Sequence, residues 1–194
     1  MKKSRTITVS IIAFFVFACA GTKENTIDSS EAAEAAQMGR NLKEKFKEDI
    51  AAGNMEVLER NGIVFLYIHD TFAFKPNSAE LTAAFKGKLK NLTDEFARAP
   101  GSIIRVEGHT ATGAMSLADL KKYPTSWELG AARSVAVVRY LQENCGIQPA
   151  RLVALSFGAY RPIASNGSEA GKSKNRRVEI SLVKKGLLYS STAD

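Results

Sequence analysis

Cysteine, histidine and long apolar runs are scarce in this chain of 194 residues. Its two cysteines are Cys19 and Cys145, and its two histidines are His69 and His109. We therefore expect no intramolecular disulfide and no metal site built from cysteine and histidine. The apolar run at residues 7–20 is too short for a membrane-spanning helix, which needs about 20 apolar residues, and it contains no acidic side chain.

The first 20 residues are typical of an export signal. Three basic side chains, Lys2, Lys3 and Arg5, precede the apolar run, which is the order found in secretory signal peptides. Their removal would lower the formal net charge from +7 by three, to +4. We therefore expect a partner in the cell envelope and no nucleic acid partner.

Two cleavage patterns overlap at the end of this segment. Val-Phe-Ala-Cys at 16–19 resembles a bacterial lipobox, in which Cys19 becomes the lipidated N-terminus. Ala18-Cys19-Ala20 also fits the A-x-A rule for ordinary cleavage before Gly21. A cysteine followed by a polar tether favours lipidation, so we expect an anchor in the outer membrane on its periplasmic face. The alternative is a soluble periplasmic protein.

A polar tether and a helix precede the compact part of the chain. Residues 21–30 are polar, whereas residues 31–50 are rich in alanine, glutamate and lysine. Leu42, Phe46 and Ile50 share one face of the expected helix, which can pack on the domain or contact a partner protein. We divide the chain into a signal at 1–20, a tether and helix at 21–54, one domain at 55–185 and a tail at 186–194.

Strands and helices alternate through the domain. The expected elements are one or two strands in 62–74, a helix from an N-cap at Ser78 to Ala97, a half-buried strand in 102–110, a helix from Thr125, a strand at 151–158, a polar loop at 162–174 and a strand at 176–185. Strands joined by helices prefer right-handed crossovers. We therefore expect an α+β sandwich of order β-α-β-α-β-β, with helices on one face of a mixed sheet.

The helix that begins at Thr125 has a clear sequence signature. Thr125 and Glu128 form the S/T-x-x-E pattern of a capping box, and Gly146 is the expected stop. Its expected apolar stripe consists of Trp127, Ala131, Val135, Val138 and Leu141.

Four blocks in this order resemble the OmpA-like C-terminal domain, the peptidoglycan-binding module of outer-membrane proteins, lipoproteins and the flagellar motor protein MotB. The blocks are FAFKPNSAEL at 72–81, IRVEGHT at 104–110, WELGAARSVAVVRYL at 127–141 and RLVALSFGAYRPIASNGSEAGKSKNRRVEI at 151–180. The resemblance covers roughly residues 63–183 and implies binding of the peptidoglycan stem peptide without catalysis or a cofactor. The segment YPTSWELGAAR is most similar to MotB, but the apolar run lacks that protein's proton-carrying Asp, so we expect no motor function.

The resemblance implies a site for an amino-acid zwitterion, in which Arg binds the carboxylate and Asp binds the ammonium. Leu129 and Arg133 match the family motif L-S-x-x-R-A, whereas Gly130 replaces its serine. Arg133 falls on the second turn of the helix from Thr125. It can therefore act together with the positive end of that helix on an anion.

The acidic half of the family pattern is missing. Ala111 follows Thr110 of the GHT block where the family has Asp, Ser126 replaces the family Asn, and Lys75 replaces an Asp of many members. Loss of one charge-assisted hydrogen bond would weaken binding roughly 10–150-fold. Asp119 is a candidate substitute acid.

The resemblance also implies roles for the last block. Asn175 and Arg177 match its N-R-R-V pattern and are expected to line the site. Since side chains alternate along a strand, only one of Arg176 and Arg177 can face it. We interpret His109 as a positional histidine and Trp127 as a core or helix-start anchor.

Three classes of function follow. The leading one is non-catalytic peptidoglycan binding that tethers the outer membrane to the wall. The second is a structural envelope protein with a degenerate site that uses residues 31–50 to contact a partner. The third, a wall hydrolase, would need paired carboxylates or an activated nucleophile, and Glu107, Glu128 and Asp119 form no recognisable pair.

Overall fold

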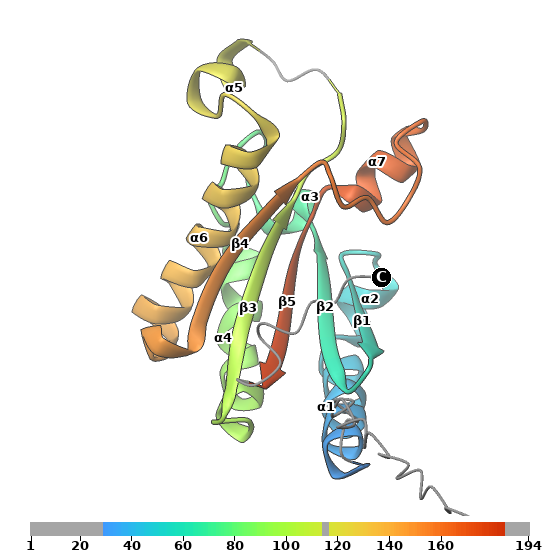
Figure 1. Cartoon of the computed structure of the whole chain (residues 1–194), viewed down its shortest axis with the longest axis vertical. Coiled ribbons are helices and arrows are strands. Elements are labelled where there is room, and N and C mark those ends of the chain that lie inside the picture. The colour runs from blue at the N-terminus through green and yellow to red at the C-terminus, as the bar shows by residue number, and fades with distance from the viewer. Residues whose placement is uncertain (1–28, 114–116, 185–194) are drawn as a thin grey trace, which may run out of the picture.

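The computed structural model describes residues 29–113 and 117–184. The expected export signal, Cys19 and the tail at 186–194 therefore lie outside the described residues. In the described part, one five-stranded sheet has the order β1-β2-β5-β3-β4, and the long helices cover one of its faces (Figure 1). Within these residues, no helix combines the length and the apolar character that crossing a membrane requires.

The sheet is mixed, because β3 and β4 pair in parallel and the other neighbouring strands pair antiparallel. The strands are β1 (Met55–Arg60), β2 (Ile63–His69), β3 (Ser102–His109), β4 (Leu152–Gly158) and β5 (Arg177–Lys184). The helices are α1 (Ser29–Lys45), α2 (Lys47–Ala51), α3 (Asp70–Ala73), α4 (Ala83–Arg98), α5 (Leu117–Lys122), α6 (Ser126–Cys145) and α7 (Glu169–Asn175), with a 3₁₀ turn at Pro149–Arg151. This architecture confirms the predicted α+β class.

Strand β1 is absent from the predicted order of elements. Its buried apolar side chains are only Met55 and Val57, so its apolar pattern is weak. Asn61 and Gly62 join it to β2 in a two-residue turn, and both have positive φ, at 50° and 66°. Asn-Gly favours this hairpin turn, because its geometry matches the twist of the flanking strands.

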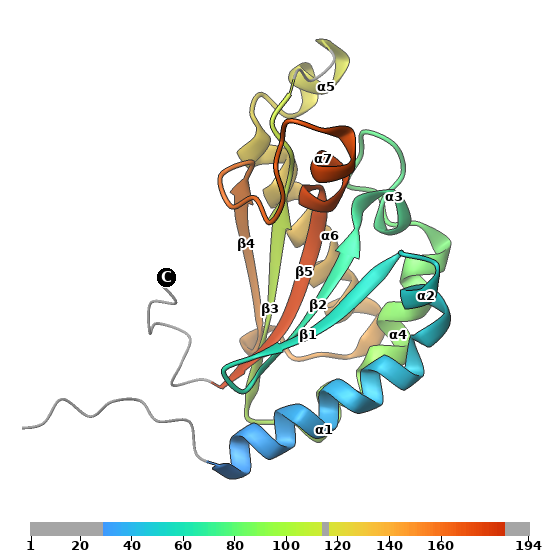
Figure 2. The same ribbon diagram turned by 90° about the vertical axis from the view of Figure 1, so that its right-hand side faces the viewer.

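Helix α1 packs against its own domain. Leu42 and Phe46, which lies just beyond its end, are buried in the core. The helix runs along β1 and β2 (Figure 2), and Lys45 Nζ is 2.9 Å from Glu95 Oε1 on α4. Of the two roles expected for residues 31–50, the structure supports packing on the domain at Leu42 and Phe46, whereas contact with a partner protein stays a prediction.

Helix α4 begins later than predicted. Thr82, not Ser78, is its N-cap, and the Thr82 hydroxyl accepts a hydrogen bond from the Phe85 N–H at 3.1 Å. Leu81 pairs with Phe74 in an isolated antiparallel bridge, so the chain is still extended directly before Thr82. The predicted buried face is confirmed at Phe85, Leu89, Leu92 and Phe96, whereas Leu81 is buried but precedes the helix.

Helix α6 has the predicted ends but a different buried face. The capping box of Thr125 and Glu128 is present, and Gly146 ends the helix with φ 67°. The predicted stripe is confirmed at Leu141, which is fully buried, and at Val138, which packs against the core. It is wrong at Trp127, which is 45% exposed, and at Val135, which is 50% exposed. The residues that α6 buries are Gly130, Arg133, Ser134, Val137 and Leu141.

Two glycines explain why α6 turns a different face toward the sheet than predicted. Gly130 lies directly against Gly108 of β3, and a Cβ added to Gly130 would come within 2.9 Å of the Gly108 carbonyl oxygen and collide with Ser156 Oγ. The Ser156 hydroxyl also donates a hydrogen bond to the Trp127 carbonyl at 2.9 Å. The first turns of α6 are thus held close to the ends of β3 and β4.

Two further expectations are wrong. Helix α7 occupies part of the segment expected to be a loop, and Ser168 caps it by accepting a hydrogen bond from the Gly171 N–H at 3.1 Å. Strand β3 is expected to be half-buried, yet Arg105 is its only partly exposed residue. The prediction placed one face of this strand in contact with solvent. That face, opposite the helices, instead carries buried charged side chains such as Glu107.

Candidate ligand-binding site

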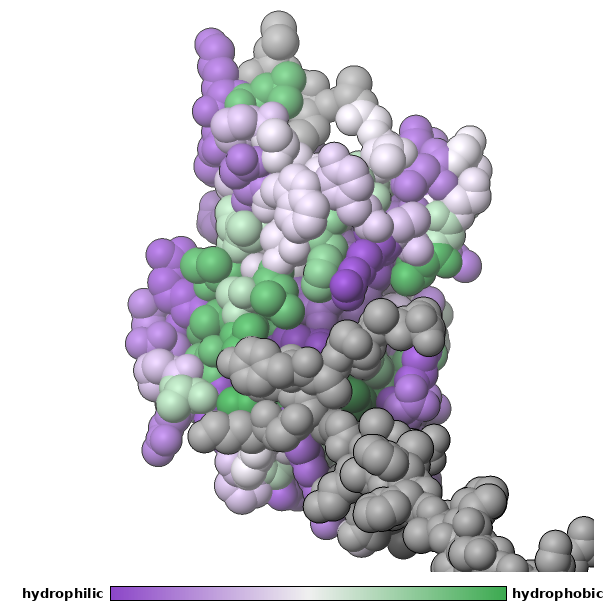
Figure 3. All heavy atoms as spheres, in the orientation of Figure 1, coloured by the Kyte–Doolittle hydropathy of each residue, from purple (hydrophilic) through white to green (hydrophobic). Residues whose placement is uncertain are grey.

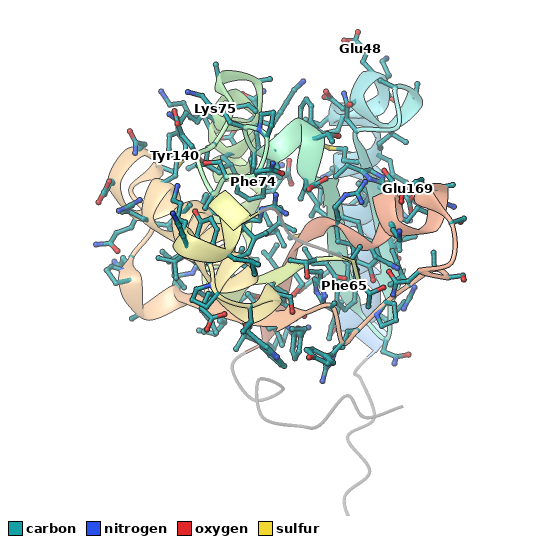
Figure 4. The ribbon with its side chains drawn as sticks, turned by 90° about the horizontal axis from the view of Figure 1, so that it is seen from above. Glu48, Phe65, Phe74, Lys75, Tyr140 and Glu169 are labelled. Carbon is teal, nitrogen blue, oxygen red and sulfur yellow. The ribbon has the colours of Figure 1, made fainter. Side chains whose placement is uncertain are left out.

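The predicted site residues come from segments that meet at one end of the sheet, where β3 and β4 end and α6 begins (Figure 1). Helices α3 and α7 lie at the same end. Figure 4 shows the molecule from this end and labels Phe74, Lys75 and Glu169, which belong to the segment after α3 and to α7.

Arg133 is buried among internal partners and is only 4% exposed. Its Nη2 atom is 3.2 Å from Asp70 Oδ2, and its Nε–H donates to the Ser78 carbonyl at 3.2 Å. The guanidinium carbon lies 5.0 Å from the centre of the Phe74 ring, which is a cation–π contact. Burial lowers the pKa of Arg133 from its usual value and the Asp70 charge opposes this, so the side chain remains a cation at neutral pH.

Asp70 is a buried acid that the sequence reasoning missed. It begins α3 directly after β2, and its carboxylate lies between two arginines, with Oδ1 3.8 Å from Arg176 Nε. Its backbone N–H also donates to the Arg176 carbonyl at 3.0 Å. One negative charge between two positive charges leaves the three side chains with a net charge of +1. The group therefore still attracts an anion.

Thr110 and Ser126 meet at Gly158, the last residue of β4. The Thr110 N–H donates to the Gly158 carbonyl at 2.8 Å, while the buried Thr110 Oγ1 has no hydrogen-bond partner among the described residues. Gly158 has a positive φ of 50°, and a Cβ there would come within 2.7 Å of Ser126 Oγ. This close approach joins the GHT block to the start of α6, one turn before the half-buried Leu129.

Two residues that depart from the family pattern, Ala111 and Lys75, lie near the surface in the described part. Ala111 is partly exposed just beyond β3. Lys75 is exposed and pairs with Glu80 at 2.5 Å, and this contact lowers the pKa of Glu80 below its usual value. The cation at position 75 is therefore already neutralised. Asp119 lies on α5, but its side chain is outside the described part, so its role stays a prediction.

Asn175 and Arg177 are engaged inside the protein. The Asn175 side chain accepts hydrogen bonds from the Ile163 and Ala164 N–H groups at 2.8 and 2.9 Å, and so fixes the loop before α7. Arg177 pairs with Glu179 and donates to the Asn175 carbonyl at 3.1 Å. Of the two consecutive arginines, Arg176 is the one that contacts Asp70. A ligand contact by Asn175 or Arg177 stays a prediction.

His109 lies between two carboxylates on the face of the sheet opposite the helices. Its Nε2 atom is 3.6 Å from Glu107 Oε2 and 3.4 Å from Glu179 Oε1. Among the described residues, these three side chains are close enough together to be considered as ligands of a metal ion. Arg105 Nε is 2.6 Å from Glu107 Oε1, and Arg177 pairs with Glu179. Because these arginines already neutralise both carboxylates, a divalent cation would meet repulsion. We interpret the group as an ionic network across β3 and β5.

The charge of Glu107 depends on this network. Burial alone would raise the pKa of Glu107, but the interaction with His109 and the positive charge of Arg105 outweigh it and lower the pKa below its usual value. His109 also stacks on Phe157, with ring centres 5.5 Å apart. The histidine thus holds neighbouring side chains in place.

Known proteins are similar to this chain in sequence. The chain is 33% identical over 113 residues to the peptidoglycan-associated lipoprotein of Pseudomonas aeruginosa, a match that covers 57% of this chain and 60% of the lipoprotein. It is 34% identical over 113 residues to outer membrane porin F of Pseudomonas fluorescens, and this match covers 58% of the chain. The chain spans only 30% of the length of that porin.

Solved structures share the fold. A MotB-like protein from Desulfovibrio vulgaris matches with a TM-score of 0.72 and 28% identity, covering 82% of this chain and 97% of that protein. The cell wall anchor of the T6SS from Pseudomonas aeruginosa matches with a TM-score of 0.64 and 27% identity, covering 74% of this chain and 97% of the anchor. The OmpA family model matches residues 73–176, which include the end of α3, all of α6 and Arg133. The chain belongs to the OmpA family.

Proposed function

We propose that this chain binds peptidoglycan through a carboxylate of the stem peptide and does not cleave it. The observation that carries the proposal is Arg133, which occupies the arginine position of the family motif and is held next to Asp70 and Arg176. The names of two similar proteins, a peptidoglycan-associated lipoprotein and a cell wall anchor, support the same ligand.

The proposed binding step is an exchange of ion pairs. The contact between Asp70 and Arg176 spans 3.8 Å, and Arg176 is more exposed than Arg133, so it is the weaker of the two Asp70 pairs. A ligand carboxylate that displaces Asp70 from Arg176 would lie next to both guanidinium groups. An ammonium group of the same ligand would then face Asp70, which takes the role of the acid missing at Ala111.

Quantified binding to purified peptidoglycan sacculi tests this proposal. Arg133→Ala should weaken binding at least tenfold, because a charge-assisted hydrogen bond contributes about 1.5–3 kcal/mol. Arg176→Ala tests the exposed partner without removing a core side chain. Arg139→Ala is the matched control, since Arg139 is an exposed arginine on the same helix. Circular dichroism must show that each variant is folded.

Three results would contradict the proposal. Folded Arg133→Ala and Arg176→Ala proteins that bind sacculi as tightly as the unmodified chain would exclude this site. Absence of binding by the unmodified chain would favour the second function, a structural envelope protein with a degenerate site. The burial of Arg133 and the loss of the acid at Ala111 are the two observations that favour this alternative. Clearing of a sacculus suspension would indicate a hydrolase instead.

We also propose that Cys19 carries a lipid anchor, so that the domain tethers the outer membrane to the wall. A lipidated cysteine would leave the chain from position 20 onward on the periplasmic side of that membrane. Mass spectrometry of the mature N-terminus tests this point. An acylated Cys19 is the expected result, and an unmodified N-terminus at Gly21 would favour the soluble periplasmic alternative.

A further inference from the structure

Two aromatic rings stack on each other at the surface next to the candidate site. Trp127, in the first turn of α6, is 45% exposed, and Tyr160, in the turn after β4, is 69% exposed. Their ring centres are 5.3 Å apart and their planes differ by 22°. Large aromatic side chains are normally buried, so a stacked pair with this much exposed surface suggests a recognition role.

The backbone holds both rings in place. The Trp127 N–H donates to Thr125 Oγ1 at 3.1 Å, and its carbonyl accepts from the Ser156 hydroxyl at 2.9 Å. The Tyr160 N–H donates to the Phe157 carbonyl at 3.0 Å, which closes the turn that carries its ring. A preorganised surface loses little conformational entropy when a ligand binds.

The stacked pair lies next to two of the predicted site residues, Thr110 and Ser126. Gly158 lies between the two segments, because it packs against Ser126 and accepts a hydrogen bond from the Thr110 N–H. Next to Tyr160, the Arg161 guanidinium carbon lies 3.8 Å from the centre of the Phe157 ring. The segments that carry the two rings thus also carry polar groups, with Ser126 next to Trp127 and Arg161 next to Tyr160 in the sequence. Such groups can form hydrogen bonds with a ligand.

These features fit the chemistry of a sugar ring. A pyranose has a flat face of C–H groups that packs on an aromatic ring, and a rim of hydroxyl and amide groups that forms hydrogen bonds. We propose that Trp127 and Tyr160 form a stacking surface for a pyranose of the glycan strand, beside the position of the stem peptide. This inference rests on the proposed function and adds the sugar as a second part of the ligand.

Two other exposed apolar side chains, Leu155 and Val135, are aliphatic. Figure 3 shows apolar surface over β4, the strand to which the exposed Leu155 belongs, and Val135 is exposed on α6. These aliphatic side chains have no stacked aromatic partner and adjoin no predicted site residue by any described contact. Val135→Ala is therefore a suitable control for the loss of exposed apolar surface from the same helix.

The single tryptophan of the chain provides a direct probe. Peptide-free glycan strands, released from sacculi by an amidase, should change the emission of Trp127 on titration, whereas sugar-free stem peptides should leave it largely unchanged. Trp127→Ala and Tyr160→Ala should each weaken glycan binding by about two- to tenfold, as measured by calorimetry. Trp127→Phe, Tyr160→Phe and Val135→Ala should bind within about twofold of the unmodified chain.

The outcomes separate this inference from the proposed function. If glycan strands neither bind nor alter the emission, while sacculi bind and Arg133→Ala does not, the stacking surface is excluded and the proposed function stands. A tryptophan response to the stem peptide alone would also overturn the inference, because the rings would then contact peptide. Absence of binding to sacculi, glycan and peptide alike would reject both proposals.

Discussion

At the scale of single residues, Gly130 and Ser156 share one small volume between α6 and β4. The family motif has serine where this chain has Gly130, and the Ser156 hydroxyl lies where a side chain at position 130 would point. Gly130→Ser should therefore lower the free energy of unfolding by about 1–3 kcal/mol through overpacking. Urea denaturation followed by the fluorescence of Trp127 measures this change.

Two further variants identify the cause. Ser156→Gly in the Gly130→Ser background should recover part of the lost stability, because it removes the colliding oxygen. Gly87→Ser is the matched control, since Gly87 lies on α4 with open space at its Cβ. There serine should stabilise by a few tenths of a kcal/mol through helix propensity. Equal losses at positions 87 and 130 would reject the packing argument.

A second residue-scale prediction concerns the missing acid. Ala111→Asp should strengthen binding to sacculi about tenfold, because a ligand ammonium would gain an acceptor in addition to Asp70. Sedimentation of the protein with sacculi measures the affinity. Thr112→Asp, at the exposed neighbouring position, is the control for added negative charge. If both variants bind alike, position 111 does not face the ligand.

At the scale of elements, the buried face of a helix could be predicted from the sequence where large apolar side chains recur at helical spacing. Helix α4 buries large side chains such as Phe85 and Leu89 at helical spacing, so its inner face could be read directly. Helix α6 turns Gly130 and Ser134 toward the sheet, and small residues carry no apolar pattern. The exposed Trp127 therefore appeared to be the inner residue, although close approach to Gly108 decides the orientation.

The candidate site shows the same limit. Arg133 could be identified because a local motif surrounds it, whereas Asp70 could not. The contact between Asp70 on α3 and Arg133 on α6 exists only once both helices pack at the same end of the sheet. An acid directly after an apolar strand was the available sign, but sequence alone does not tell which cation it meets.

Helix α1 provides a prediction at this scale. Leu42→Ala should lower the free energy of unfolding by about 2–5 kcal/mol, because Leu42 is fully buried between α1 and the domain. Lys43→Ala, at the exposed neighbouring position, should change it by less than about 0.5 kcal/mol. Urea denaturation of both variants measures the difference. A Leu42→Ala protein as stable as the control would show that α1 is not docked in solution.

At the scale of the whole molecule, buried ion pairs join layers that the apolar core also holds together. Glu95 on α4 binds Lys45 of α1 at 2.9 Å and Arg98 of its own helix at 2.6 Å. On the other face of the sheet, Glu107 and Glu179 pair with Arg105 and Arg177. Neighbouring cations lower the pKa of Glu95 and of Glu107, and protonation of these two carboxyls would leave arginine and lysine unpaired, so the fold should be sensitive to acid.

Glu95 shows the sign of this dependence. Burial alone would raise the pKa of Glu95, but hydrogen bonds from Arg98 and Lys45 outweigh it and lower the pKa below the usual 4.5. A carboxyl with a lower pKa in the folded state stabilises the fold above pH 4.5. That stability is lost as the pH falls through the lower folded value. The free energy of unfolding should thus be nearly constant above about pH 5.5 and decline below 4.5.

Glu95→Gln should remove this contribution, about 1–2 kcal/mol at pH 7, a value reduced because Lys45 and Arg98 reach solvent. The variant should also lose less stability between pH 5 and 3 than the unmodified chain, because its amide does not titrate. Urea denaturation across this pH range measures both effects. Glu44→Gln is the control, since Glu44 pairs with Lys47 at an exposed position of α1 and should leave the acid slope unchanged. Parallel pH profiles for Glu95→Gln and the unmodified chain would mean that other carboxyls, Glu107 foremost, set the acid sensitivity of the fold.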